Sequence, residues 1–142
     1  MTPTLVVDTS ALVAIELDEP DAQWFADTLA ASDDPVMSSG TLQELITVLG
    51  HRAGIPATMT LDFATELTIS VLNQGVRIIP VDEGLAVLGA ASTLRYRSAP
   101  SRFNYGDGFA YALALELDAA MLCKGDDFAN ADVPVMQSPG SN

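Results

Sequence analysis

Short apolar runs alternate along the chain with longer stretches in which apolar residues recur every three or four positions. The short runs predict β-strands at residues 4–8, 36–38, 76–80, 120–123 and 133–137. The longer stretches predict helices at residues 10–17, 20–31, 40–52, 57–73 and 83–94, the last of them capped by Asp82. A further helix is expected to open near Asp107.

Strands that alternate with helices are typical of βαβ units, in which a mostly parallel sheet is covered by helices on both faces. The chain has 142 residues, of which 49% are apolar, so we expect one folded α/β domain over residues 1–142. The sequence contains no internal repeat and no interdomain linker. Residues 138–142 are expected to form a flexible tail.

Four acidic residues fall where a predicted strand or loop meets a predicted helix: Asp8, Glu44, Asp107 and Asp126. The carboxyl ends of parallel strands share one edge of the sheet, where ligand sites form. Carboxylates gathered there raise one another's pKa unless a cation intervenes. Because Mg²⁺ takes oxygen ligands, the pattern indicates metal-assisted phosphate chemistry.

Each of these acids also has an ordinary structural interpretation. Asp8 can cap the helix that follows it, and Glu44 completes a capping-box pattern over residues 41–44. Asp107 is favoured at a helix start by the helix dipole, and Asp126 lies in a tight turn where Asp is common. Their shared placement at strand ends and helix starts is what favours a common functional site.

The charge balance argues against simple electrostatic binding of nucleic acid. Nineteen acids against six Lys and Arg residues give a net charge of −13, whereas nucleic-acid binders usually carry a basic face. Such a field favours a basic protein partner. Half of the basic residues, Arg95, Arg97 and Arg102, precede Asp107, where they either contact phosphate or belong to a surface loop.

Several other kinds of site are not supported. The only histidine, His51, lies at a predicted helix end without partners at zinc-ligand spacing. The single Cys123 excludes an intrachain disulfide, and no P-loop or nucleophile-elbow motif is present. The sequence has no secretion signal and no apolar run of about 20 residues, so we expect a cytoplasmic protein without a membrane span.

Three segments together resemble a known family. The opening segment LVVDTSAL (residues 5–12) looks like the start of PIN-domain proteins, and Glu44 lies at the expected place in the third helix. The segments NYGDGFAYALA (residues 104–114) and LCKGDDF (residues 122–128) resemble the two C-terminal motifs of VapC-type toxins. The resemblance extends over nearly the whole chain.

This resemblance implies a three-layer α/β/α sandwich with a mostly parallel central sheet. It implies a Mg²⁺-dependent endoribonuclease, with Mn²⁺ as an alternative metal, that serves as the toxin of a type II toxin–antitoxin system. A small cognate antitoxin that blocks the active site, an RNA substrate and a homodimer are implied as well.

At the level of residues, the resemblance implies that Asp8 and Asp107 are metal ligands and that Glu44 is a ligand or positions the attacking water. Asp126 fits the motif for the fourth acid, and the adjacent Asp127 is the alternative. Thr9 or Ser10 is expected to orient Asp8. Gly108 departs from the family pattern, in which a bulkier small residue is usual.

Three alternatives are open at this point. A haloacid-dehalogenase-type phosphatase needs a second Asp two residues after Asp8, where this chain has Ser10. A phospho-accepting receiver domain needs an Asp at the end of the third strand, where Pro80 and Val81 stand. A PIN-like binding protein with weak or lost nuclease activity is disfavoured because all four acids are present.

Overall fold

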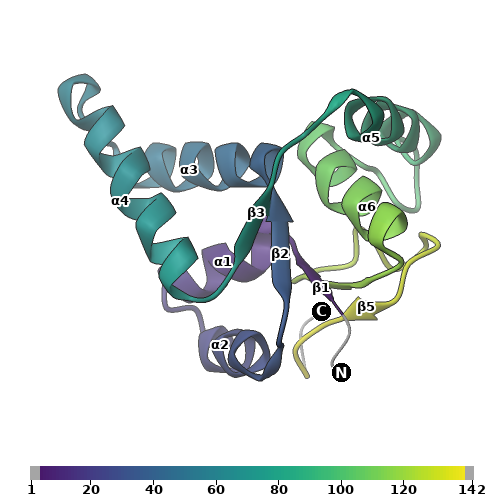
Figure 1. The fold of residues 1–142 in the computed structure, drawn as a ribbon, viewed down its shortest axis with the longest axis horizontal. Helices are drawn as coiled ribbons and strands as arrows, with labels where there is room; N and C mark the ends of the chain where they lie inside the picture. The colour runs from purple at the N-terminus through teal and green to yellow at the C-terminus, as the bar shows by residue number, and fades with distance from the viewer. Residues whose placement is uncertain (1–3, 140–142) are drawn as a thin grey trace.

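The computed structural model describes residues 4–139. Its centre is a five-stranded sheet, which Figure 1 shows between the helices. The strand order is β3-β2-β1-β4-β5, and every neighbouring pair is parallel. The strands are β1 (Leu5–Val7), β2 (Pro35–Ser38), β3 (Arg77–Ile79), β4 (Ala120–Leu122) and β5 (Val135–Met136). The predicted parallel sheet is confirmed.

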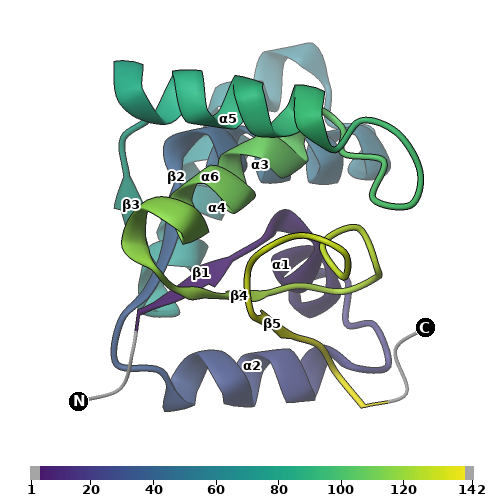
Figure 2. The same ribbon diagram turned by 90° about the vertical axis from the view of Figure 1, so that its right-hand side faces the viewer.

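Helices cover both faces of this sheet, which gives three layers. The helices are α1 (Thr9–Glu16), α2 (Ala22–Ala31), α3 (Ser39–Ala53), α4 (Thr60–Asn73), α5 (Glu83–Arg95) and α6 (Tyr105–Leu117). Alternate residues of β1 point into different cores: Leu5 and Val7 pack with α1 to α4, whereas Val6 packs with α5 and α6. Figures 1 and 2 show α5 and α6 on one side of the strands and α2 on the other. The predicted α/β/α sandwich is therefore confirmed.

Most predicted elements shift by one or two residues at their ends, and three of the shifts concern α4, α6 and β5. The helix predicted over residues 57–73 begins as a 3-10 turn, Ala57–Met59, before α4 starts at Thr60. The last helix opens at Tyr105, because Asn104 takes the N-cap. The last strand is only Val135–Met136, and the preceding Pro134 has no N–H to donate to a neighbouring strand.

The expected flexible tail does not begin at Ser138. Ser138 is buried, and its hydroxyl donates to Asp21 Oδ2 over 2.9 Å. Residues 140–142 of the expected tail lie outside the described residues. Within residues 4–139, no helix is both long and apolar enough to cross a membrane.

Candidate active site

Asp8 occupies the junction between β1 and α1. Its carboxylate caps α1 by accepting from Ser10 N at 3.1 Å, and it also accepts from Ser10 Oγ at 2.7 Å. The same hydroxyl accepts from the backbone N–H of Lys124 at 2.8 Å, just beyond β4. Ser10 thus links Asp8 to the chain just beyond the neighbouring strand β4. Asp8 does cap the helix, and it does so from the carboxyl end of the central strand.

Glu44 projects from α3 toward α1, where Thr9 Oγ1 donates a hydrogen bond to Glu44 Oε1. The predicted capping box over residues 41–44 is wrong. Ser38 is the N-cap of α3, and it accepts from Thr41 N at 3.0 Å. Thr9 therefore differs from its expected role, because its hydroxyl holds Glu44 while Ser10 holds Asp8.

Gly106 determines how closely Glu44 approaches α6, a contact that no local pattern in the sequence indicates. A Cβ atom on Gly106 would coincide with the Glu44 carboxylate, so only glycine admits the acid there. Gly108 has a different task. Its Cβ would lie 2.7 Å from the carbonyl oxygen of Gly89, so Gly108 lets α5 and α6 touch along their backbones. Both glycines are thus needed for close packing, Gly106 against a side chain and Gly108 against a neighbouring helix.

Asp107 is the third residue of α6 and forms a complete capping box with Asn104. Asn104 N donates to Asp107 Oδ2 at 2.8 Å, and Asp107 N donates to Asn104 Oδ1 at 3.0 Å. Asp107 is only 7% exposed, close to the 6% of Asp8. Two nearly buried carboxylates without a basic residue on their hydrogen bonds are costly unless another charge compensates them.

The electrostatics indicate that the acids act on one another. Burial, together with the charges of Asp8, Asp127 and Glu44, raises the pKa of Asp107 to about 7, against a hydrogen bond from Asn104 that lowers it. Burial also raises the pKa of Asp8, although the Ser10 hydrogen bonds oppose the shift. The pKa of Glu44 is raised by burial and by the charge of Asp8, against the Thr9 hydrogen bond. Shifts of this kind are typical of carboxylates that are removed from water and lie near one another.

The two candidates for the fourth acid are both exposed on the loop after β4. Burial is the largest cause of the raised pKa of Asp8 and of Asp107, and the charge of Asp127 raises both further. The charge of Asp126 contributes to the raised pKa of Cys123, which burial brings to about 12. The electrostatic coupling to the other acids is thus carried by Asp127, while Asp126 stays a prediction of the motif.

The donors present fit a hard divalent cation. Asp8, Glu44 and Asp107 offer only oxygen atoms, the ligand type of Mg²⁺ and Mn²⁺, whereas zinc sites usually include His or Cys. Within residues 4–139, no three Asp, Glu, His or Cys side chains converge closely enough to hold a metal ion. Because Mg²⁺ keeps several waters and binds through one or two carboxylates, a preassembled cage is not required.

The predicted basic loop lies between α5 and α6. Figure 2 shows it projecting on the same side of the molecule as the loop after β4. Arg95 Nη2 lies 3.4 Å from Asp132 Oδ2, and its guanidinium lies over the Tyr96 ring at 5.0 Å. Arg97 and Arg102 are exposed and form no ion pair within the described part of the chain. Of the three arginines, these two are therefore the ones that can contact a ligand.

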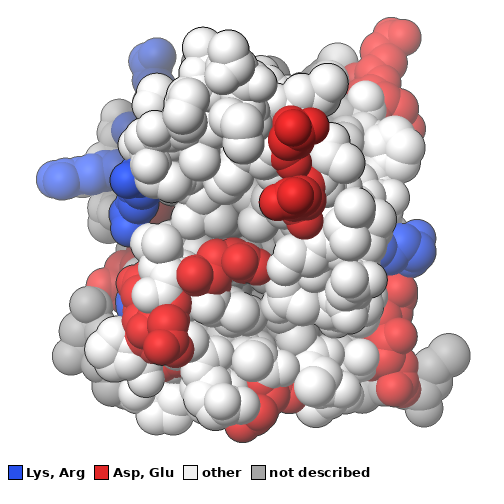
Figure 3. Space-filling view, turned by 90° about the vertical axis from the view of Figure 1, so that its left-hand side faces the viewer, with Lys and Arg blue, Asp and Glu red and all other residues white. Residues whose placement is uncertain are grey.

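The other basic residues are mostly occupied by acids. Arg77 binds Asp34 at 3.1 Å, and Lys124 Nζ lies 3.0 Å from Asp21 and 3.3 Å from Glu19. In the face shown in Figure 3, acidic side chains are spread over the surface while Lys and Arg appear only near its edges. This face therefore gives little electrostatic support for a polyanion.

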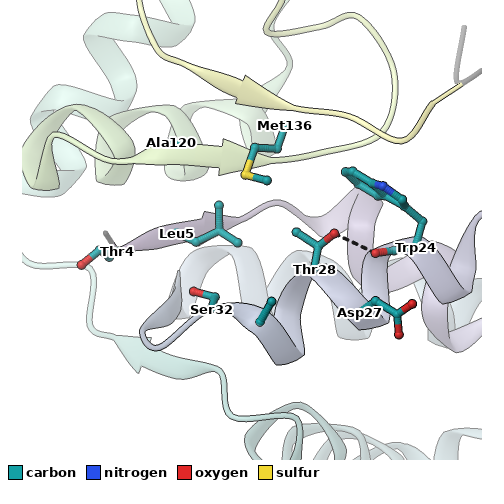
Figure 4. Close-up of a pocket in the computed structure, with 9 residues that line it drawn as sticks. Thr4, Leu5, Trp24, Asp27, Thr28, Ser32, Ala120 and Met136 are labelled. Carbon is teal, nitrogen blue, oxygen red and sulfur yellow. Dashed lines mark hydrogen bonds between the residues drawn. The ribbon is translucent and has the colours of Figure 1, made fainter. Parts of the chain in front are cut away.

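A hollow of about 470 Å³ lies away from the acids (Figure 4). It is lined by apolar residues such as Leu5, Trp24 and Met136, and it opens between α2 and the strands β1 and β4. Leu5 starts β1, whereas Asp8 follows its end. This hollow is therefore separate from the acid site.

Comparison with known proteins matches the PIN domain family over residues 5–134. "Ribonuclease VapC" of Mycolicibacterium smegmatis is 38% identical over 91% of this chain and 97% of the relative. "Ribonuclease VapC30" of Mycobacterium tuberculosis is 33% identical over 95% of this chain and all of the relative. Among solved structures, Mycobacterium tuberculosis VapC20, a "Sarcin-Ricin loop cleaving toxin", superposes with a TM-score of 0.71 at 18% identity over 91% of this chain and 95% of that one. The VapBC2 structure from Rickettsia felis superposes with a TM-score of 0.68 at 13% identity. The match covers 96% of this chain and 99% of that chain.

The fold, the position of the acids and the family match define the class, a PIN-domain protein. Within that class, the chain belongs to the VapC branch of the family. The resemblance inferred from the three sequence segments is confirmed.

Proposed function

We propose that the protein is a divalent-metal-dependent endoribonuclease that acts as the toxin of a type II toxin–antitoxin pair. The observation that carries the proposal is the pair of buried acids Asp8 and Asp107, electrostatically coupled to the half-buried Glu44, at the carboxyl end of a parallel sheet. The ribonuclease names of the curated relatives support the reaction type.

In this proposal Asp8 and Asp107 hold the metal, and Asp127 completes the site more readily than Asp126 because its charge already acts on both acids. A divalent ion held there would supply an activated water and would stabilise charge on the phosphate. Ser10 keeps Asp8 in one orientation, and Thr9 keeps Glu44 where it can orient a water. The protein's contribution is thus a rigid set of oxygen donors.

Removing divalent metal should stop cleavage of RNA completely. Added EDTA should abolish the activity, and excess Mg²⁺ or Mn²⁺ should restore it, whereas Zn²⁺ should restore little because the site offers no nitrogen or sulfur. The measurement is the rate of cleavage of a labelled RNA by purified protein, with an Asp8→Asn preparation as the control for contaminating nuclease. Cleavage that persists after thorough chelation would exclude this function.

The proposed partner is a small antitoxin with a basic segment. Several structurally similar proteins were solved as VapBC complexes, and the net charge of −13 favours a cationic ligand. Bidentate contacts from arginine to the site carboxylates are the expected mode of inhibition. A homodimer is also proposed, and the exposed apolar residues Val87 and Leu94 on α5 offer a face for it.

Association with the antitoxin should be fast at low salt and slow at least tenfold at high salt, because opposite charges steer the encounter. The partner to test is the product of a short reading frame beside the gene, and the measurement is the association rate by stopped-flow at several salt concentrations. A rate that does not change with salt would show that charge does not steer this partner.

Replacing Arg97 and Arg102 by Ala should weaken RNA binding and lower the magnitude of the slope of log K against log salt by roughly 1.4, because each lost phosphate contact on a single strand removes about 0.7 from that slope. Arg95→Ala is the matched control, since Arg95 already contacts Asp132. Equal slopes for wild type and double variant would mean that these arginines only solvate the loop.

A further inference from the structure

A small groove adjoins the acids between α3 and the start of α6. It encloses about 250 Å³, and its lining includes Gln43, Glu44, Val48, Tyr105 and Phe109. We refer to it as the α3–α6 groove. A Cβ atom on Gly40 would lie only 2.5 Å from the nearest atom of the Phe109 ring. The position of this ring in the wall of the groove therefore depends on a glycine in α3.

Tyr105 is the most unusual residue of this groove. It is 82% exposed, although it is a large aromatic residue and the first residue of α6. Its ring packs at 5.2 Å and 87° against Phe109, so it is braced from one side. The remaining ring surface faces solvent. Exposed aromatic rings are a common means of stacking on the bases of single-stranded nucleic acid.

The groove is continuous with the acid site. Glu44 lines it and also accepts from Thr9 beside Asp8. Gly106 lines it as well, and the next residue is Asp107. A ligand that fills the groove therefore lies directly beside the carboxylates, within reach of a group attached to a phosphate held there.

Charge limits how this protein can hold RNA. Three of its six basic residues, Arg77, Arg95 and Lys124, are paired with acids. The protein therefore has too few free cations to bind RNA through many phosphates. Stacking of a base on an aromatic ring needs no charge and contributes to affinity without salt dependence. Sequence-specific recognition of RNA also relies on unpaired bases that stack on aromatic side chains.

We infer that the α3–α6 groove binds one unpaired nucleobase of single-stranded RNA, next to the phosphate that is cleaved. The base stacks on Tyr105, Val48 provides apolar contact, and the exposed amide of Gln43 can hydrogen-bond to the edge of the base. This assignment rests on the proposed ribonuclease function and adds a substrate subsite to it.

The test compares Tyr105→Ala with Tyr105→Phe, which keeps the ring and loses only the hydroxyl. Binding of a short unstructured RNA is measured in the Asp8→Asn background, where the RNA stays intact, and cleavage is measured in the Asp8 protein. Tyr105→Ala should weaken binding about tenfold with an unchanged salt slope, and should raise KM more than it lowers kcat. Tyr105→Phe should stay within about twofold of the parent, since stacking on the ring is kept.

Leu61→Ala is the matched control, because Leu61 is 78% exposed on α4 and does not line the groove. If the wild type cleaves RNA and Tyr105→Ala binds and cleaves it equally well, the subsite is wrong while the ribonuclease function stands. The subsite is equally wrong if Tyr105→Ala leaves RNA binding intact but weakens self-association or the antitoxin complex. If wild-type protein neither binds nor cleaves RNA, the proposed function and the subsite are overturned together.

Discussion

Replacing Asp107 by Asn should reduce RNA cleavage at least a thousandfold and at the same time make the protein more stable at neutral pH. Activity is lost because the amide cannot replace a negatively charged oxygen ligand. Stability rises because a buried carboxylate, close to the charges of Asp8, Asp127 and Glu44, is removed. Asn keeps an oxygen that can accept from Asn104 N, so the capping box of α6 survives.

The pH dependence of stability makes this prediction specific. The folded protein holds the Asp107 proton up to a pKa of about 7, whereas the ordinary value is 3.8. Between these values the folded state binds more protons than the unfolded state, so the free energy of unfolding falls as pH rises through the window. The loss of stability caused by ionising Asp107 is absent below about pH 4 and complete above about pH 7. There it is on the order of 2–4 kcal/mol.

Urea unfolding of wild type and Asp107→Asn, in EDTA and across pH 4 to 8, measures this difference. The two curves should lie together at the acid end and separate as pH rises, with the variant the more stable. Asp62→Asn, an exposed acid in the first turn of α4, serves as control and should follow the wild type. Curves for Asp107→Asn and wild type that run parallel across the range would show that Asp107 does not carry this electrostatic cost.

The sequence predicts the residues that lie at strand ends better than it predicts their partners. Asp8 can be recognised because an apolar run ends at Val7 and a polar helix start follows, a purely local pattern. The bond from Thr9 to Glu44 joins residues 35 positions apart. Nothing in the local pattern at either residue reveals it, which is why the spacing around Glu44 favours a capping box that does not form.

Long-range packing also explains the other differences. Asn104 lies within a polar stretch of sequence and cannot be recognised there as a helix cap. Its two reciprocal hydrogen bonds with Asp107 show where α6 begins. The segment Gly-Asp-Gly indicates a need for close approach, but which atoms approach depends on how α3 and α5 pack against α6. Lys124 likewise has the sequence context of a turn residue, whereas in the fold it ties the end of β4 to Glu19 and Asp21.

The glycine before Asp107 gives the sharpest test of the site's geometry, because two glycines occupy the same helical position in different surroundings. Gly106 is the second residue of α6 after the Asn104 cap, and Gly84 is the second residue of α5 after the Asp82 cap. Helix propensity alone predicts that Ala at either position stabilises by about 0.5–1 kcal/mol. A Cβ on Gly84 would meet its nearest atom at an ordinary 3.6 Å, whereas one on Gly106 would coincide with the Glu44 carboxylate.

Gly106→Ala should therefore push the Glu44 carboxylate, the far end of a flexible side chain, away from its place beside Thr9. It should slow RNA cleavage about 100-fold and change the free energy of unfolding by less than about 1 kcal/mol. Gly84→Ala should leave cleavage unchanged and unfold at equal or higher urea concentration. Urea midpoints and single-turnover cleavage rates for both variants provide the comparison. If Gly106→Ala is as active as Gly84→Ala, the contact between Glu44 and α6 does not position the acid, and Glu44 has no role that depends on it.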